Sequence, residues 1–185
     1  MNTWLRNPLE HYGTLKLAWA MITRAAKLLL LAGIALFYTL VVFNNLTDFD
    51  SNYVFVRHTV SMDTTFPGNN GMWRALHSPA IQLVFYLSII AWEILTTVLL
   101  WWGAVRLLRA LRLPSIRFNK AKAVPVAALT LSLLMWLVAF LDVGGEWFLM
   151  WQSASWNGQQ AAFRMFTVVG IVLLVVLVPD AEGQP

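Results

Sequence analysis

Four apolar runs, separated by shorter polar or mixed segments, organise this sequence of 185 residues. Because an α-helix needs about 20 apolar residues to cross a hydrocarbon core about 30 Å thick, the runs predict four membrane-spanning helices. We place these helices at about residues 25–45, 80–105, 123–141 and 160–178. The uninterrupted part of the last run, Met165 to Val178, is too short to span alone, so this helix is expected to begin near Gln160. The predicted fold is an all-α membrane protein, a four-helix transmembrane bundle within a single domain of residues 25–178.

Two mixed segments, residues 46–79 and 142–159, follow the first and third predicted spans and are too polar to cross the bilayer. Both contain many aromatic side chains, which concentrate at membrane interfaces. The second segment also contains Gly144 and Gly145. We expect the two segments to form an outer cap of short helices and loops on the bundle.

The first cap segment carries local signals for helices and a turn. Asp50 or Ser51 can cap a short helix that ends near Met62. Residues 67–71, with the sequence PGNNG, predict a turn, and residues 72–77 predict a second short helix.

The segment before the first span is predicted to be a separate tail. Pro8 and Gly13 are expected to interrupt any long helix there. Met21 precedes the first apolar run, with Arg24 and Lys27 close behind it, so translation could start at Met1 or at Met21.

Lysine and arginine residues cluster in the loop of residues 106–122, between the second and third spans. Such residues accumulate at the cytoplasmic ends of membrane helices. The loop therefore predicts that both tails, residues 1–24 and 179–185, are cytoplasmic. We attribute the net charge of +4 to this topology and predict no nucleic-acid partner.

Composition narrows the possible chemistry. The hydrophobic fraction of 59% is far above that of soluble domains, so the lipid bilayer is the main solvent. The sequence has no cysteine, which excludes disulfides, thiolate nucleophiles and cysteine-held metals or iron–sulfur clusters. His11, His58 and His77 lie outside the predicted spans, which argues against haem held within the bilayer. No cofactor is predicted.

Five strings in the outer segments are long and unusual. They are NNLTD at residues 44–48, FVRH at 55–58, SMDTTFP at 61–67, GGEWFLMWQS at 144–153 and WNGQ at 156–159. With these strings the chain, from about Met21 to Pro179, resembles a bacterial family of predicted small integral membrane proteins, a four-span domain of unknown function. The resemblance implies four spans in a bacterial cytoplasmic (inner) membrane and brings no established activity.

Glu93 is the sharpest single candidate, because it lies near the middle of the second predicted span, where a carboxylate is costly. Gln82, Tyr86 and Thr97 stand at helical spacings from it, so all four side chains are expected on one inward face. We take Glu93, Gln82 and Tyr86 as membrane-embedded candidates.

Two interpretations of Glu93 stay open. It could be neutral and hydrogen-bonded to another helix, for example to Tyr38 or Trp136, and so join the helices. Alternatively, it could serve as a proton relay or as the polar end of a ligand pocket.

Polar, charged and aromatic side chains also gather in the outer segments. The candidates for an outer-face ligand or interaction site are Asn44, Asn45, Asp48, Arg57, His58, Asp63, His77, Asp142, Glu146, Trp147, Trp151 and Arg164. Arg164 could pair with Glu146 or Asp142. The group could tie the outer loops down, or hold an organic ligand or a metal. Because no compact ligand spacing such as HExxH occurs, we predict no metal site.

No recognisable catalytic constellation occurs, so no catalytic residue is assigned and an enzyme is not the favoured interpretation. We favour a non-enzymatic accessory subunit that stabilises a larger membrane complex, with a membrane-protein partner or a second copy as its contact. One alternative is a small proton-coupled transporter or channel that uses Glu93. Another is a membrane enzyme or redox protein with an outer-face His/Asp/Glu site.

Overall fold

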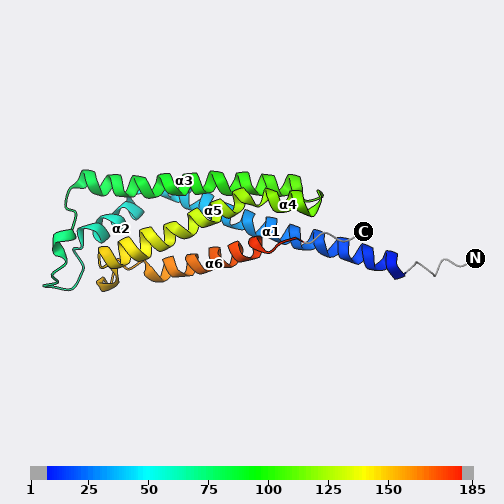
Figure 1. Ribbon diagram of the computed structural model, residues 1–185. Helices are drawn as coiled ribbons and strands as arrows, with labels where there is room; N and C mark the ends of the chain where they lie inside the picture. Colours follow the sequence, from blue (N-terminus) through cyan, green and yellow to red (C-terminus); the bar gives the residue numbers. More distant parts are fainter. Residues whose placement is uncertain (1–7, 181–185) are drawn as a thin grey trace, which may run out of the picture.

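The computed structural model describes residues 8–180, and long helices dominate these residues (Figure 1). Four helical stretches are long and apolar enough to cross a membrane: Leu15–Thr47, Pro79–Ala110, Ser115–Trp147 and Gln159–Leu177. They run up and down along one common direction (Figure 1). The predicted all-α four-helix fold is confirmed. Parts of the two predicted cytoplasmic tails lie outside the described residues, namely residues 1–7 and 181–185.

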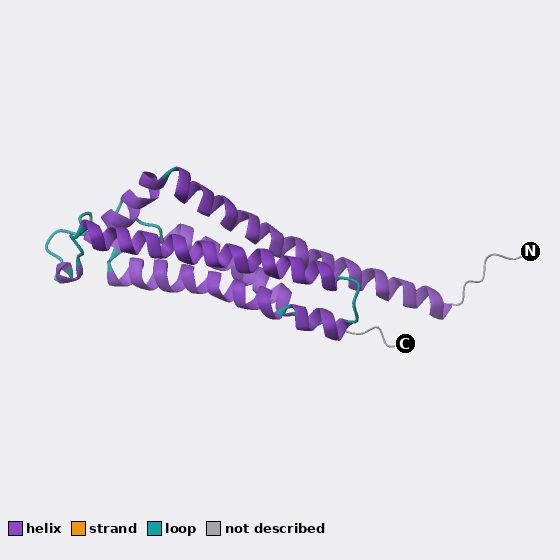
Figure 2. Cartoon of the chain, turned by 90° about the horizontal axis from the view of Figure 1, so that it is seen from above, coloured by secondary structure: helices purple, strands orange, loops and turns teal. Residues whose placement is uncertain are grey.

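Helix α1 (Pro8–Thr47) is continuous, so the prediction that Pro8 and Gly13 interrupt it is wrong. Pro8 is the first helical residue, where its missing N–H has no intrahelical partner to lose. A glycine inside a helix costs only about 1 kcal/mol relative to alanine, which a helix of this length tolerates. The early turns of α1 project beyond the other helices (Figures 1 and 2).

Helix α2 (Phe49–Ser61) begins directly after α1, and its bounds agree closely with those of the short helix predicted to end near Met62. The residue before its first turn is Asp48, not Asp50 or Ser51, and its side chain makes no capping hydrogen bond. Only a short 3₁₀ turn, η1 (Met72–Arg74), forms in place of the predicted second helix. We call the end of the bundle that carries α2 and η1 the cap end (Figure 1).

Helix α3 (Pro79–Ala110) returns from the cap end to the opposite end, which we call the basic end because it holds the arginines and lysines of residues 106–122. Two consecutive helices, α4 (Ser115–Ala121) and α5 (Ala123–Leu134), then lead back. Gly103 of α3 packs against Pro125 of α5 so closely that a Cβ atom on Gly103 would lie 3.1 Å from the proline ring. The glycine therefore sets the close approach of α3 and α5.

A π-helical segment, η2 (Met135–Trp147), continues α5 to the cap end. The third span thus extends past its predicted end at residue 141, and Gly144 and Gly145 lie in the helix instead of a loop. A Cβ atom on Gly145 would meet the Gln159 side-chain nitrogen at 2.5 Å, so glycine permits this contact. A 3₁₀ turn, η3 (Met150–Gln152), precedes the last helix, α6 (Gln159–Leu177).

The core has two parts. The larger one joins the four long helices through side chains such as Leu31, Leu107 and Leu129, all fully buried. The smaller one lies beneath the cap and includes Val60 and Tyr86. Large apolar side chains point outward along the whole bundle, for example Val84 at 64% and Leu174 at 66% exposure. Such a surface is stable in lipid and would be unfavourable in water.

Candidate functional site

Glu93 is buried on α3, with 3% of its surface exposed. Gln82 and Tyr86, at 5% and 1%, are buried on the same helix. The helical spacing of the three residues therefore corresponds to a shared inward face. Gln82 does not contact the carboxyl group; its side-chain nitrogen donates to the Leu76 carbonyl at 2.7 Å and ties the start of α3 to the cap.

The hydrogen-bond partner of Glu93 is Asn45 of α1, not Tyr38 or Trp136. Asn45 Nδ2 donates to Glu93 Oε2 at 2.5 Å, and Asn52 Nδ2 of α2 donates to Asn45 Oδ1 at 2.7 Å. The Tyr38 hydroxyl is paired with Ser132 of α5 at 2.7 Å. A polar chain thus leads from a carboxyl group inside the bundle to an exposed amide on α2.

A cavity of about 380 Å³, which we call the Glu93 cavity, adjoins this chain. Its polar lining residues are Asn44, Asn45, Asn52, Tyr86, Glu93 and Trp136, and no lysine or arginine borders it. The Trp136 indole N–H lies near the Tyr38 hydroxyl but makes no hydrogen bond of standard geometry with any described residue. A buried donor without a partner is unusual, and here it belongs to a residue that lines a cavity.

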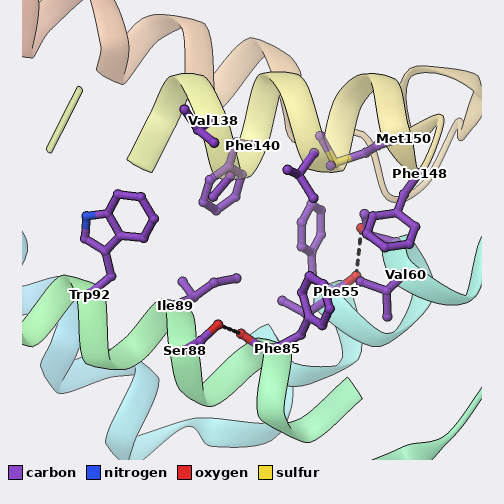
Figure 3. Close-up of a pocket in the computed structure, with 15 residues that line it drawn as sticks. Phe55, Val60, Phe85, Ser88, Ile89, Trp92, Val138, Phe140, Phe148 and Met150 are labelled. Atoms are coloured by element: carbon purple, nitrogen blue, oxygen red, sulfur yellow. Dashed lines mark hydrogen bonds between the residues drawn. The ribbon is translucent and has the colours of Figure 1, made fainter. Parts of the chain in front are cut away.

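A second cavity, of about 190 Å³, lies between α2, α3 and η2, and we call it the aromatic cavity (Figure 3). Its labelled lining is mostly apolar, with Trp92 and Phe140 toward one end and Phe148 and Met150 toward the other (Figure 3). The Trp92 indole nitrogen is occupied, because it donates to the Leu131 carbonyl at 3.1 Å. Phe55, Val56, Ile89 and Phe140 border both cavities.

The outer-face candidates do not form one site. His58 and Asp63 are paired, with Nδ1 and Oδ2 2.7 Å apart, and the His58 ring stacks on Trp156 at a centroid distance of 4.6 Å. Asn44 and Asn45 belong to the Glu93 cavity instead. Within residues 8–180 no group of three or more His, Asp or Glu side chains is arranged to hold a metal ion.

The remaining outer-face candidates are dispersed on exposed positions. These are Asp48, Arg57, His77, Asp142, Glu146, Trp147, Trp151 and Arg164. The expected ion pair of Arg164 with Glu146 or Asp142 does not form among the described side chains, and Arg164 is exposed. Trp151 instead packs edge-on against Phe66.

Arg74 holds the cap together in a way that the sequence did not indicate. Its guanidinium group donates to the Trp147 carbonyl at 3.0 Å and lies over the rings of both Trp73 and Trp147. The two tryptophans contact each other edge to face. We call this group of Trp73, Arg74 and Trp147 the clasp. It joins the two cap segments and leaves Trp73 75% exposed.

At the basic end, Asp180 is buried among three cations. Its Oδ2 lies 2.7 Å from Lys27 Nζ and 2.5 Å from Lys122 Nζ, and its Oδ1 lies 3.8 Å from Arg24 Nε. Burial alone would raise the pKa of Asp180, but the hydrogen bonds from Lys122 and Lys27 outweigh burial and hold that pKa below its ordinary value. Lys27 and Lys122 also donate to the Val178 carbonyl, so the segment after α6 is fixed to α1 and to the junction of α4 and α5.

Residues 23–179 match a family described as predicted small integral membrane protein (DUF2165). The chain belongs to this family. Its members carry no assigned function in that description, so the match shows an integral membrane protein of unknown function in contact with lipid. Comparison with curated proteins and with solved structures finds no match for this DUF2165 member.

The Glu93 cavity of this DUF2165 member offers groups that can form hydrogen bonds. The cavity offers a carboxyl group, amides, a phenol and an indole N–H beside apolar walls. Sequence reasoning identified Glu93, Tyr86, Asn44 and Asn45 but did not place them together, because α1 and α3 pair only in the fold. Asn52 was missed, although its position seven residues after Asn45 could have indicated it.

Proposed function

We propose that this protein is a non-enzymatic membrane protein that binds a small amphipathic molecule in the Glu93 cavity. One observation carries the proposal: the buried Glu93 carboxyl group and the Trp136 indole line the same cavity of about 380 Å³, and the indole N–H makes no hydrogen bond of standard geometry with a described residue. Ligand sites combine an apolar wall with a few convergent polar groups in this way.

We also propose that the membrane is the bacterial cytoplasmic membrane, with the basic end and both termini on its cytoplasmic side.

A purely structural role for Glu93 explains less. The Glu93–Asn45 hydrogen bond alone would satisfy a polar contact that joins α1 and α3. Such a contact needs neither a neighbouring cavity nor an indole N–H at Trp136 without a well-aligned acceptor, and a buried donor left unsatisfied is unfavourable by about 1–3 kcal/mol. A ligand oxygen that accepts from Trp136 would remove that penalty.

The lining also indicates the ligand class. Trp136 requires an acceptor, while the carboxyl group and the amides can accept from a donor. A hydroxyl group meets both needs, and the apolar walls of Phe55, Ile89 and Phe140 suit a hydrocarbon or aromatic body. We therefore propose an uncharged amphiphile with a hydroxyl or carbonyl head group.

Binding is favoured over the transporter that uses Glu93. From Glu93 toward the cap end, Asn45 and Asn52 continue the polar chain. Toward the basic end, the buried polar groups include Thr96 and the Tyr38–Ser132 pair, and the helices otherwise pack there through fully buried apolar side chains such as Leu31, Leu100 and Leu107. A polar site that meets an apolar layer toward the basic end suits a binding protein better than a pathway across the membrane.

The test is native mass spectrometry of the protein in nanodiscs made from the source membrane. We expect wild type to retain a small molecule of constant mass, and Trp136→Phe to lower its occupancy about fivefold or more without lowering thermal stability further than Trp92→Phe does, because a hydrogen bond is worth about 1 kcal/mol. Trp92→Phe is the matched control: it loses the hydrogen bond to Leu131, so stability should fall while occupancy stays. A wild-type protein with no retained mass, or equal occupancy in both variants, would contradict the proposal.

The accessory role is a second candidate, supported by the exposed clasp of Trp73, Arg74 and Trp147 on the cap. Tryptophan and arginine are enriched where protein interfaces bind most strongly. If the cap contacts a larger membrane complex, Trp73→Ala should abolish the co-purification of a stoichiometric partner. Trp19→Ala, which removes an equally exposed tryptophan from α1, should not do so.

A further inference from the structure

The four basic side chains Arg106, Arg109, Arg117 and Lys120 surround one hollow of about 360 Å³ at the basic end. Arg106 and Arg109 stand three residues apart on the last turns of α3, and Arg117 and Lys120 have the same spacing on α4. Because residues three apart share a helix face, each helix places two basic residues beside the hollow. The small buried residues Ala110 and Ala121 also border it.

The charge of this hollow is uncompensated within residues 8–180. None of the four cations forms an ion pair or a side-chain hydrogen bond with a described residue, and no acidic residue borders the hollow. The buried cations Arg24, Lys27 and Lys122 differ, since Asp180 accompanies all three. An anion is therefore the complementary occupant.

The distribution of cations is more specific than membrane topology requires. Orientation by positive charge needs lysines and arginines at one end of the bundle, but it does not need them around one hollow. Arg112 is an example of an arginine at the basic end that does not border the hollow; it is exposed and lies between α3 and α4.

We infer that this hollow binds the phosphate group of an anionic lipid. Arginine forks match phosphate oxygens well, and basic pockets between helices at the level of the lipid head groups bind anionic lipids. The hollow adjoins the basic end of a predicted span, where head groups lie. Free phosphate compounds share the same chemistry, and the experiment separates the two sources.

The experiment compares lipid retention in the full-length protein by native mass spectrometry. The protein is reconstituted in nanodiscs of phosphatidylcholine with about one phosphatidylglycerol in five lipids, which resembles a charged leaflet. Arg109→Gln and Arg117→Gln each remove one charge from the hollow, one on each helix. Arg112→Gln removes one charge beside it and is the matched control. All three positions are exposed, and thermal unfolding checks that each variant folds.

We expect Arg109→Gln and Arg117→Gln each to reduce the retained anionic lipid about fivefold, while Arg112→Gln stays near wild type, since one cation near a charged surface contributes about 1 kcal/mol. Equal losses in all three variants would show general attraction to the membrane and overturn the site. A second arm uses pyrophosphate with phosphatidylcholine nanodiscs. Tight binding there that depends on Arg109, together with no selective lipid retention, would overturn the assignment to lipid.

Discussion

Asn45 and Glu93 face each other across the interface of α1 and α3, where the amide nitrogen of one donates to the carboxyl oxygen of the other at 2.5 Å. Both residues are buried, at 5% and 3% exposure. The Asn45 side chain is uncharged, and no basic residue borders the Glu93 cavity. It behaves as a polar link between helices that also forms part of a cavity wall.

The role of the carboxyl group can be separated from that of its charge. Glu93→Gln retains an acceptor oxygen for Asn45, so we expect a change in the free energy of unfolding within about 1 kcal/mol. Glu93→Ala leaves the amide without its partner and should be destabilising by about 1–3 kcal/mol. Reversible denaturation in detergent micelles measures both. Equal destabilisation by the two variants would show that the fold needs the carboxyl group itself and not only an acceptor oxygen.

Asn45 and Asn44 form a matched pair of neighbours with different surroundings. Asn45→Ala removes the donor to Glu93 and the acceptor for Asn52, so we expect the free energy of unfolding to fall by about 1–3 kcal/mol. Asn44 is exposed, and Asn44→Ala should change the free energy of unfolding by less than about 0.5 kcal/mol. The same denaturation assay applies, and an equal effect of both substitutions would refute a special role for Asn45.

Gly103 and Gly33 test the close approach of α3 and α5. A Cβ atom on Gly103 would lie 3.1 Å from Pro125, whereas one on Gly33 would meet nothing within 4 Å. We expect Gly103→Val to destabilise the bundle by about 1–3 kcal/mol through overpacking. Gly33→Ala should be neutral or stabilising by up to about 1 kcal/mol, since alanine favours helix. Thermal unfolding measures both variants. Equal shifts of their midpoints from the wild-type value would contradict the close packing of Gly103 against Pro125.

Acid should weaken the contacts of Asp180. Because its pKa is lower in the folded protein than in the unfolded chain, the carboxylate stabilises the fold fully above about pH 4, the ordinary value for aspartate. That stabilisation is lost as the pH falls below this value and through the folded pKa. Thermal unfolding midpoints of wild type and Asp180→Asn should therefore differ most at neutral pH and draw together as the pH falls below about 4.

Asp142→Asn provides the control for this titration, because Asp142 is exposed and forms no ion pair among the described residues. At neutral pH, loss of a buried partner should make Asp180→Asn less stable by about 3–5 kcal/mol. A difference from wild type that stays constant down to pH 3 would contradict the role assigned to the carboxylate.

The parts of the fold that could be predicted are those set by local pattern. Apolar runs of sufficient length specify the spans, and the spacing of Gln82, Tyr86 and Glu93 specifies one helix face. The continuous start of α1 does not follow from the general rule that proline and glycine break helices, because Pro8 occupies the first helical position and a long helix tolerates a single glycine at Gly13. The π-helical segment η2 was also missed, since two adjacent glycines usually indicate a loop.

The candidate site could be predicted only in part, because its contacts join residues far apart in sequence. Asn45 and Glu93 are 48 positions apart, and Lys27 and Asp180 are 153 apart. Which faces of the long helices meet depends on side-chain packing, for example on Gly103 against Pro125. The outer-face candidates divide for the same reason: Asn44 and Asn45 line the Glu93 cavity, whereas His58 pairs with Asp63.

The wall between the two cavities sets how large a ligand the protein can accept. Phe55 and Phe140 border both spaces, so the partition consists partly of aromatic rings rather than main chain. Rings can change rotamer while helices stay in place. A molecule longer than the Glu93 cavity could therefore extend into the aromatic cavity by turning a ring aside, and bulk at positions 55 and 140 would act as a length gauge.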